Sequence, residues 1–388
     1  MALPLKPLFF FSFVSLVSGS YSLLLPVTKD AATLQYVTQI HHGTPLVPIK
    51  LVLDLGAPFL WLDCSSGHVS SSNTPILCGS IQCLTAKTSD SGHGGGTSTC
   101  RLSPKNTITG LAEAGELAED MVAVEGSEMG SRFLFSCAPK PLLKGLASGT
   151  VGMLGLGRTR IALPSQLAAS VGLHRKFAVC LSSSEGTVFL ENEIAGTDVS
   201  KSLMYTPLLP GQDPNSEGYF ISVKSIRING RGVSLGTITG GTRLSTVVPY
   251  TTMKRSVYDI FTKAYIKAAA SMNITRVESM APFGVCFRSE SSEPAVPTID
   301  LVLQSEMVKW RILGRNSMVR VSDKVMCLGF LDGGVDPGTA IVIGGHQLED
   351  NLLEFDLSTS MLGFSSSLST RESSCSELKL NSIFKGSL

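Results

Sequence analysis

Short stretches of alternating or continuous apolar residues run along most of the chain and predict mainly β-structure. Residues 32–40 alternate apolar and polar positions, as a half-buried strand does. Leu51 to Leu53 form a continuous apolar run typical of a buried strand, and Phe59 to Trp61 resume it after Gly56. Further strands are predicted at 133–137, 150–158, 219–223 and 226–230, and an Ala-rich helix at 256–271.

An acidic residue interrupts the most apolar of these stretches. Asp54 follows Leu53 directly and precedes Gly56, so it is predicted at a strand end in a tight loop. Two interpretations are open. Asp54 either caps the turn by accepting hydrogen bonds from local backbone amides, or is one half of a catalytic carboxylate pair.

The second half of the chain repeats the plan of the first. Asp54 precedes Val151 by almost the same interval as Ser245 precedes Ile341, and both intervals end in a glycine-bearing strand. This spacing predicts a duplicated lobe. Pro, Gly, Asp and Asn crowd together at 207–218 and predict the boundary there. The predicted segments are a signal peptide at 1–22, an N-terminal lobe at 23–210 and a C-terminal lobe at 211–388.

The N-terminus and the composition indicate a secreted protein. Residues 1–22 carry one lysine, an apolar run too short to span a bilayer and then small residues, as a secretory signal peptide does. The mature chain has no longer apolar run, so we expect no membrane association. The formal charge of +1 gives no basic field, so nucleic acid is not an expected partner. The sequon at Asn273 predicts N-glycosylation.

Nine cysteines fit an oxidising compartment. Their spacing lacks the paired ligands of a zinc site, so disulfides are expected and no metal. The odd number leaves at least one thiol unpaired or in an intermolecular bond. Connectivity cannot be read from the sequence, but Cys286 with Cys327 is our single predicted pair, because these residues bracket one segment of the second lobe.

Two other groups of ionisable residues receive ordinary structural interpretations. Adjacent side chains on a strand point to opposite faces, so His41 and His42 are expected at the surface or in a turn rather than as metal ligands. The acidic residues of the segment 112–124, which include Glu119 and Asp120, are expected on a solvated hairpin surface.

Six motifs together resemble one plant protein family. They are Asp-Leu-Gly at 54–56, Phe-Ser-Cys-Ala-Pro at 135–139, Gly-Arg-Thr-Arg-Ile-Ala-Leu-Pro-Ser-Gln at 157–166, Asn-Ile-Thr-Arg-Val at 273–277, Ala-Pro-Phe-Gly at 281–284 and Ile-Gly-Gly-His-Gln-Leu-Glu-Asp-Asn at 343–351. The family is that of the extracellular dermal glycoproteins and basic globulins, with the xylanase inhibitors and the xyloglucan-specific endoglucanase inhibitors. The resemblance covers essentially the whole mature chain. It implies an all-β, bilobal pepsin-like (acid protease) fold with a few short helices.

The resemblance also implies a defective catalytic centre. Pepsin-like enzymes carry Asp-Thr/Ser-Gly in each lobe, and here Leu55 stands where the first copy has Thr or Ser, while Ser245 falls on the second aspartate. The segment 112–124 falls where these enzymes place a flap over the cleft, and it has no tyrosine. The mechanism requires two carboxyls that share a proton, and a serine hydroxyl cannot replace one. Asp54 and Ser245 are therefore expected to be vestigial, and the chain is not expected to be a peptidase.

The function implied is inhibition of microbial cell-wall glycoside hydrolases in plant defence. In the endoglucanase inhibitors an arginine shortly before the last cysteine enters the hydrolase cleft, and Arg371 holds that position here. Cysteines that the family normally carries are missing from the region 84–100, which is shortened. The loop 287–294 is also short. The inhibitors can carry a second contact arginine in this loop, and Arg288 does not clearly align with it. A secreted extracellular monomer without cofactor is implied. Two alternatives stay open: a weak aspartic peptidase that uses Asp54, and a storage globulin or binder of a small extracellular peptide.

Overall fold

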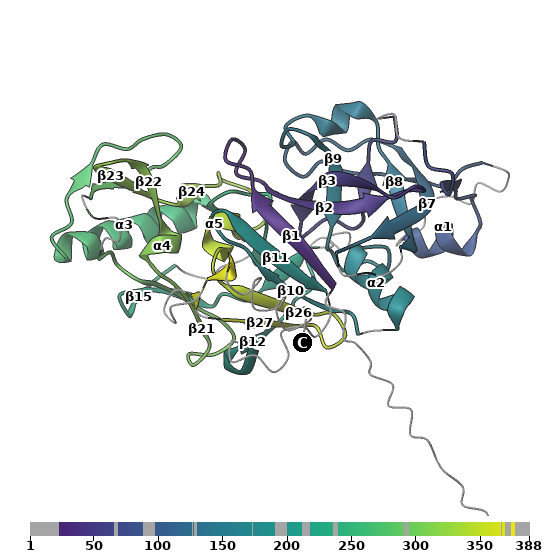
Figure 1. Ribbon diagram of the computed structural model, residues 1–388. Helices are drawn as coiled ribbons and strands as arrows, with labels where there is room; N and C mark the ends of the chain where they lie inside the picture. Colours follow the sequence, from purple (N-terminus) through teal and green to yellow (C-terminus); the bar gives the residue numbers. More distant parts are fainter. Residues whose placement is uncertain are drawn as a thin grey trace, which may run out of the picture.

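The largest sheet of the protein contains strands from both halves of the chain (Figure 1). The computed structural model describes residues 23–65, 69–87, 98–125, 127, 130–172, 174–190, 200–211, 218–235, 240–289, 291, 295–365, 367–368 and 374–376. In these residues the sheet has 14 strands: β1 (Leu23–Lys29), β2 (Tyr36–His42), β3 (Val47–Asp54), β4 (Trp61–Leu62), β5 (Thr74–Pro75), β6 (Arg101–Leu102), β7 (Gly115–Ala123), β8 (Ser131–Cys137), β9 (Thr150–Gly155), β10 (Lys176–Cys180), β11 (Glu185–Leu190), β12 (Met204–Pro207), β26 (Leu352–Asp356) and β27 (Met361–Phe364).

Three smaller sheets lie among the described residues of the second half. The first has five strands, in the order β13 (Tyr219–Ile221), β16 (Thr242–Leu244), β25 (Ile341–Ile343), β17 (Thr251–Met253) and β24 (Phe330–Asp332). The other two have four each, β15 (Arg231–Val233), β14 (Ser225–Ile228), β20 (Ile299–Val302) and β21 (Lys309–Ile312), and β18 (Arg276–Val277), β19 (Cys286–Arg288), β23 (Val325–Leu328) and β22 (Met318–Ser322).

In the described part of the chain, the helices are short apart from one. They are α1 (Ile81–Ala86), α2 (Leu163–Val171), α3 (Arg255–Ser271), α4 (Gly314–Ser317) and α5 (Gly345–Leu348), with 3-10 turns η1 (Lys140–Leu143) and η2 (Ser200–Ser202). The predicted helix at 256–271 is α3, which buries Val257, Phe261, Tyr265 and Ala269 at intervals of four residues, as the helical repeat requires. The all-β, bilobal pepsin-like fold expected from the sequence is confirmed.

The two lobes are joined through antiparallel pairing of β10 with β26. Phe177 of β10 and Phe355 of β26 stack with ring centroids 4.9 Å apart, and Tyr219 packs on the same rings. All three side chains are fully buried. This pairing places the last strands of the chain, β26 and β27, beside strands of the first half, as the labels at the centre of Figure 1 show.

Eight of the nine cysteines form four disulfides, Cys64–Cys137, Cys83–Cys100, Cys180–Cys375 and Cys286–Cys327. The last is the pair expected from the sequence, and it joins residues that lie opposite each other on β19 and β23. Cys78 is the unpaired thiol. The Cys180–Cys375 bond ties β10 to the C-terminal part of the chain.

Candidate functional site

Asp54 ends β3 in a tight loop, as the sequence predicts. β3 runs parallel to β9, with Asp54 opposite Gly155, and the Asp54 carbonyl accepts a hydrogen bond from the Leu156 amide at 2.9 Å. A Cβ atom at Gly155 would lie 2.5 Å from the carbonyl oxygen of Phe59. Only glycine therefore permits this close approach of β9 to the Asp54 loop.

Both carboxylate oxygens of Asp54 already have hydrogen-bond donors. The Gly56 amide donates to Oδ1 at 2.8 Å, and the Thr107 hydroxyl donates to Oδ2 at 2.6 Å. Only 2% of the residue is exposed. Burial raises the pKa of Asp54, although hydrogen bonds from Thr107 and Gly56 and the charge of Arg243 act in the opposite direction. The local bond from Gly56 is the turn-capping geometry that the sequence left as one of two interpretations.

Ser245 lies on a second loop that contacts the first. It follows β16, its amide donates to the Ile343 carbonyl at 3.0 Å, and its hydroxyl accepts from the Val248 amide at 3.3 Å. The neighbouring Thr246 joins the loops, because its hydroxyl accepts from the Leu55 amide at 3.0 Å and donates to the Leu53 carbonyl at 2.8 Å. The structure therefore brings the two loops together.

Arg243 is a member of this site that the sequence analysis missed. It lies on β16, two positions before Ser245. Side chains two positions apart on an extended chain point to the same face. Burial lowers the pKa of its guanidinium, and the charge of Asp54 raises it. Its Nε is buried and has no hydrogen-bond partner among the described residues. The signal available in the sequence was an arginine two positions before Ser245, on the strand that leads into the second loop.

The segment that covers Asp54 differs from the one we predicted. Residues 115–123 of the expected flap form β7, which pairs along its length with β8. The covering turn lies earlier, at 106–110. Asn106 fixes this turn by donating to the carbonyls of Leu142 at 2.8 Å and Lys144 at 2.9 Å, and Gly110 has a φ of 77°. Thr107 projects from it to Asp54.

Two residues predicted at the surface are buried. Asp120 is fully buried, with Oδ1 accepting from the hydroxyls of Ser70 and Ser72 and from the Met121 amide. His42 is 6% exposed, and its Nε2 lies 3.6 Å from Oδ2 of Asp120. The prediction failed because both residues occupy inward positions on their strands, and hydroxyls from a distant loop supply the polar partners.

The remaining predicted sites are Asn273 and Arg371. Asn273 is exposed just beyond α3, in a left-handed conformation with a φ of 59°. Arg371 lies outside the described residues, as does the predicted signal peptide at 1–22. Within the described part of the chain, no group of three or more His, Cys, Asp or Glu side chains is arranged to hold a metal ion. Nor does that part contain a helix long and apolar enough to cross a membrane.

Both halves of the chain match models of one family. Residues 36–190 match the model described as "Xylanase inhibitor N-terminal", and residues 218–366 match "Xylanase inhibitor C-terminal". The chain belongs to the xylanase inhibitor family. The two matched ranges fall on either side of the predicted lobe boundary at 210 and 211, which stays a prediction.

Relatives of this xylanase inhibitor family member carry names of different kinds. The chain is 49% identical over 412 residues to "Probable aspartic proteinase GIP2" of Nicotiana benthamiana, over 93% of this chain and 92% of that protein. It is 40% identical to "Gamma conglutin 1" of Prunus dulcis, over 91% and 88% of the two chains. The solved structure titled "Crystal structure of edgp" is 46% identical, has a TM-score of 0.84 and covers 92% of this chain and 97% of its own. The names thus include an aspartic proteinase and a conglutin, whereas the family models are described as xylanase inhibitor domains.

Proposed function

We propose that this protein is secreted and inhibits microbial cell-wall glycoside hydrolases, either a xyloglucan-specific endoglucanase or a xylanase. The observation that carries the proposal is the match of both halves to the xylanase inhibitor family. Such hydrolases act with two carboxyl groups in an open cleft. A guanidinium inserted there forms charge-assisted hydrogen bonds and excludes substrate. We assign this role to Arg371.

The experiment is a titration of the mature protein against fungal xyloglucan-specific endoglucanase and xylanase, with reducing-sugar release as the readout. We expect stoichiometric inhibition of one of the two. The Asp54→Asn variant is the matched control and should inhibit equally, because Asp54 lies at the centre between the lobes and not in the Arg371 segment. Absence of inhibition of both enzymes would overturn the proposal. In that case binding of a small extracellular peptide without inhibition would favour the globulin-type function, which the conglutin and globulin names of several relatives support.

Peptidase activity is the less favoured function, because the environment of Asp54 opposes it. We infer that Ser245 takes the place of the second catalytic aspartate. The next residue, Thr246, supports this, because its hydroxyl bonds the backbone on both sides of Asp54 and so joins the two loops. The water nucleophile of an aspartic protease is activated between two carboxyls that share a proton. Here a lone carboxylate has both oxygens engaged, and although burial raises its pKa, no second carboxyl is present at Ser245 to share a proton with it.

Restoring the missing carboxyl alone should not create a peptidase. We expect Ser245→Asp to cleave protein substrates at acid pH no faster than the uncharged control Ser245→Asn, because Thr107 still donates to Oδ2 of Asp54 and the positive charge of Arg243 still acts against protonation of the pair. A working acid–base group typically contributes ~10²–10⁴ in rate, so a gain would be easy to detect. Pepstatin-sensitive cleavage by Ser245→Asp, but not Ser245→Asn, would show that loss of the second acid is the sole defect.

Secretion and glycosylation belong to the same proposal. Asn273 is exposed just beyond α3, and Thr275, which completes the sequon, is exposed as well, so both residues that the glycosylation signal requires face solvent. We expect the protein secreted from plant cells to lose mass on treatment with an N-glycosidase, and Asn273→Gln to remove that loss. An unchanged mass in the wild type would contradict occupancy.

A further inference from the structure

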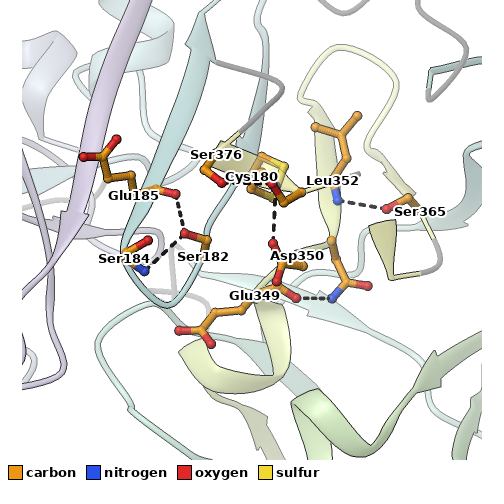
Figure 2. The surroundings of a disulfide bond; sticks show 12 residues. Cys180, Ser182, Ser184, Glu185, Glu349, Asp350, Leu352, Ser365 and Ser376 are labelled. Atoms are coloured by element: carbon orange, nitrogen blue, oxygen red, sulfur yellow. Dashed lines mark hydrogen bonds between the residues drawn. A yellow bond between two sulfur atoms is a disulfide. The ribbon is translucent and has the colours of Figure 1, made fainter. Parts of the chain in front are cut away.

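The side chain of Asn273 differs from those of two other residues in the left-handed conformation. Asn229 and Asp350 share its positive φ, and each uses its side chain to hold a distant segment. Oδ1 of Asn229 accepts from the Thr298 amide at 2.8 Å. Oδ1 of Asp350 accepts from the Cys375 amide at 3.3 Å, beside the disulfide in Figure 2. Within the described part of the chain, the Asn273 side chain has no hydrogen-bond partner, so its amide nitrogen is available for modification.

Backbone bonds alone fix Asn273 at the end of α3. Its own amide donates to the Ala270 carbonyl at 3.1 Å, and the Ile274 amide donates to the Ala269 carbonyl at 3.0 Å. These two bonds are the usual backbone closure of a helix C-terminus around a left-handed residue. The conformation explains why Asn is tolerated here, but it leaves the side chain without a structural role.

The rest of the sequon is tied to β19. The Thr275 carbonyl accepts from the Arg288 amide at 2.9 Å, and the next two residues form β18, which pairs antiparallel with β19. Both the glycan attachment residue and the residue that completes the sequon therefore lie on fixed backbone. A sugar attached to Asn273 would start from a defined position beside β19.

A cavity of about 240 Å³ lies at this position, and Asn273 is one of its lining residues. The buried part of its lining is apolar and belongs to the main hydrophobic core, since it consists of Phe287, Met318 and Met326. Half-buried Ile274 and Val296 pack against the same core and extend this apolar lining. The cavity therefore has a firm apolar wall next to the sequon.

The lining and the size of the cavity suit one sugar that is already attached. Ligand sites are mostly apolar with a few polar groups, and here Thr275, Arg288 and Ser289 supply polar atoms. The cavity is smaller than the ~300–1,000 Å³ typical of sites for free small ligands. A sugar bonded to Asn273 does not need so large a site, because the covalent link makes its docking an intramolecular event.

We propose that this cavity is a subsite for the first N-acetylglucosamine of a glycan on Asn273. The inference rests on the proposed glycosylation of this residue. The acetamido methyl group packs on the apolar wall, and the Arg288 guanidinium donates to the sugar oxygens. The docked sugar stabilises the folded protein, because it makes these contacts only when the cavity is formed.

Two substitutions at Thr275 give a matched pair with and without the glycan. Thr275→Ala removes the sequon but leaves Asn273 and its left-handed backbone, whereas Thr275→Ser keeps the sequon. Both variants keep the backbone bond from Arg288. Thr275→Ser protein produced with high-mannose glycans and trimmed by an endo-β-N-acetylglucosaminidase carries a single sugar, which is the form that tests the subsite.

We expect the single-sugar form of Thr275→Ser to melt about 2 °C above Thr275→Ala, and the untrimmed glycan to add little. Ala295 lines the cavity and is exposed, so Ala295→Phe fills the cavity from its edge. In that background the single sugar should no longer change the melting temperature, and comparing the two differences removes any effect of the phenylalanine itself. If Ala295→Phe does not fold, Arg288→Ala replaces it and should lower the difference by about half, because one donor to the sugar is lost.

The outcomes distinguish failure of this inference from failure of the proposed glycosylation. Mass spectrometry of the secreted wild type that finds no glycan on Asn273 overturns the glycosylation, and the subsite with it. If Asn273 is occupied, the melting temperatures test the subsite alone. A single-sugar form that melts with Thr275→Ala overturns the subsite, as does a difference that is unchanged by the cavity variant. Stabilisation that requires the untrimmed glycan also overturns it, because the outer sugars then make the contact.

Discussion

Replacing Glu349 by glutamine should lower the free energy of unfolding by about 3 kcal/mol, the cost of leaving one partner of a buried ion pair without its counter-charge. Glu349 Oε1 lies 2.6 Å from Nζ of Lys29 and accepts a hydrogen bond from the Tyr36 hydroxyl at 2.8 Å. Lys29 and Tyr36 lie on β1 and β2, whereas Glu349 follows α5 in the second half of the chain. The residue therefore joins elements from opposite halves of the molecule.

Three further contacts account for the strength of this site. The Lys29 and Glu349 side chains are only 13% and 7% exposed, so solvent screens their attraction little. Lys29 Nζ also lies 5.6 Å from the centre of the Tyr36 ring. His346 Nδ1 approaches Oε2 at 3.4 Å, and its Nε2 lies 3.0 Å from the Met318 carbonyl oxygen. Because a carbonyl only accepts, Nε2 must carry a proton to form that bond.

The stability difference between wild type and Glu349→Gln should depend on pH. Burial alone would raise the pKa of Glu349, but the hydrogen bonds and charges of His346 and Lys29 outweigh burial and hold that pKa below its ordinary value of 4.5. The folded protein thus binds fewer protons at this site than the unfolded chain. The contribution is complete above pH 4.5 and is lost as the pH falls through the lowered pKa.

Chemical denaturation of the wild type and Glu349→Gln, at pH 7 and at a series of pH values below 4.5, would measure this difference in the free energy of unfolding. The matched control is Arg132→Gln, which breaks an ion pair of similar length, 2.9 Å to Glu119, with 46% and 22% of the side chains exposed. The control should cost at most about 1 kcal/mol. Lys29→Met with Glu349→Gln should cost less than the two single variants together, because neither charge is then left alone. A Glu349→Gln effect as small as the control, or independent of pH, would contradict the argument.

Sequence patterns predicted best where a local repeat decides the structure. The four-residue repeat of α3 and the apolar run of β3 predicted elements close to those observed. The spacing of apolar residues shows whether one face or both faces of an element are buried. The placement of Asp54 at a strand end followed from the same run and the glycine after it. The pairing of Cys286 with Cys327 was predicted because the two residues bracket one segment of the second lobe, and the structure places them opposite each other on neighbouring strands.

Contacts between distant segments were beyond those patterns. The sequence gives no local sign that Thr107 reaches Asp54, 53 positions earlier, or that Ser70 and Ser72 bury Asp120. The motif at 343–351 was recognised from its sequence, but only the structure shows what its residues do. Gln347 accepts from the amide and hydroxyl of Thr251 and donates to two carbonyls, and Glu349 binds Lys29. Such reasons require the fold, because each partner lies on a different element.

The largest effect on function is expected at Arg371. We expect Arg371→Ala to weaken inhibition of the target hydrolase by about 30-fold to 1,000-fold, which corresponds to the 2–4 kcal/mol typical of a central arginine hot spot. The reason is specific to the guanidinium, which can meet a carboxylate through two parallel hydrogen bonds. Arg371→Lys keeps the charge but loses that geometry, so it should retain only part of the affinity.

Arg288→Ala provides the matched control for Arg371→Ala. Arg288 ends β19, is exposed and belongs to the same half of the chain, but it lies in the shortened loop region that lacks a clear match to an inhibitory contact. Its removal should change the inhibition constant by less than about threefold, as most surface substitutions do. Dissociation rates from surface-immobilised hydrolase would separate the two variants, because loss of a buried charge pair appears mainly in the off-rate. If Arg371→Ala and Arg288→Ala both inhibit as tightly as the wild type, the inhibitory contact lies elsewhere and Arg371 does not contribute to it.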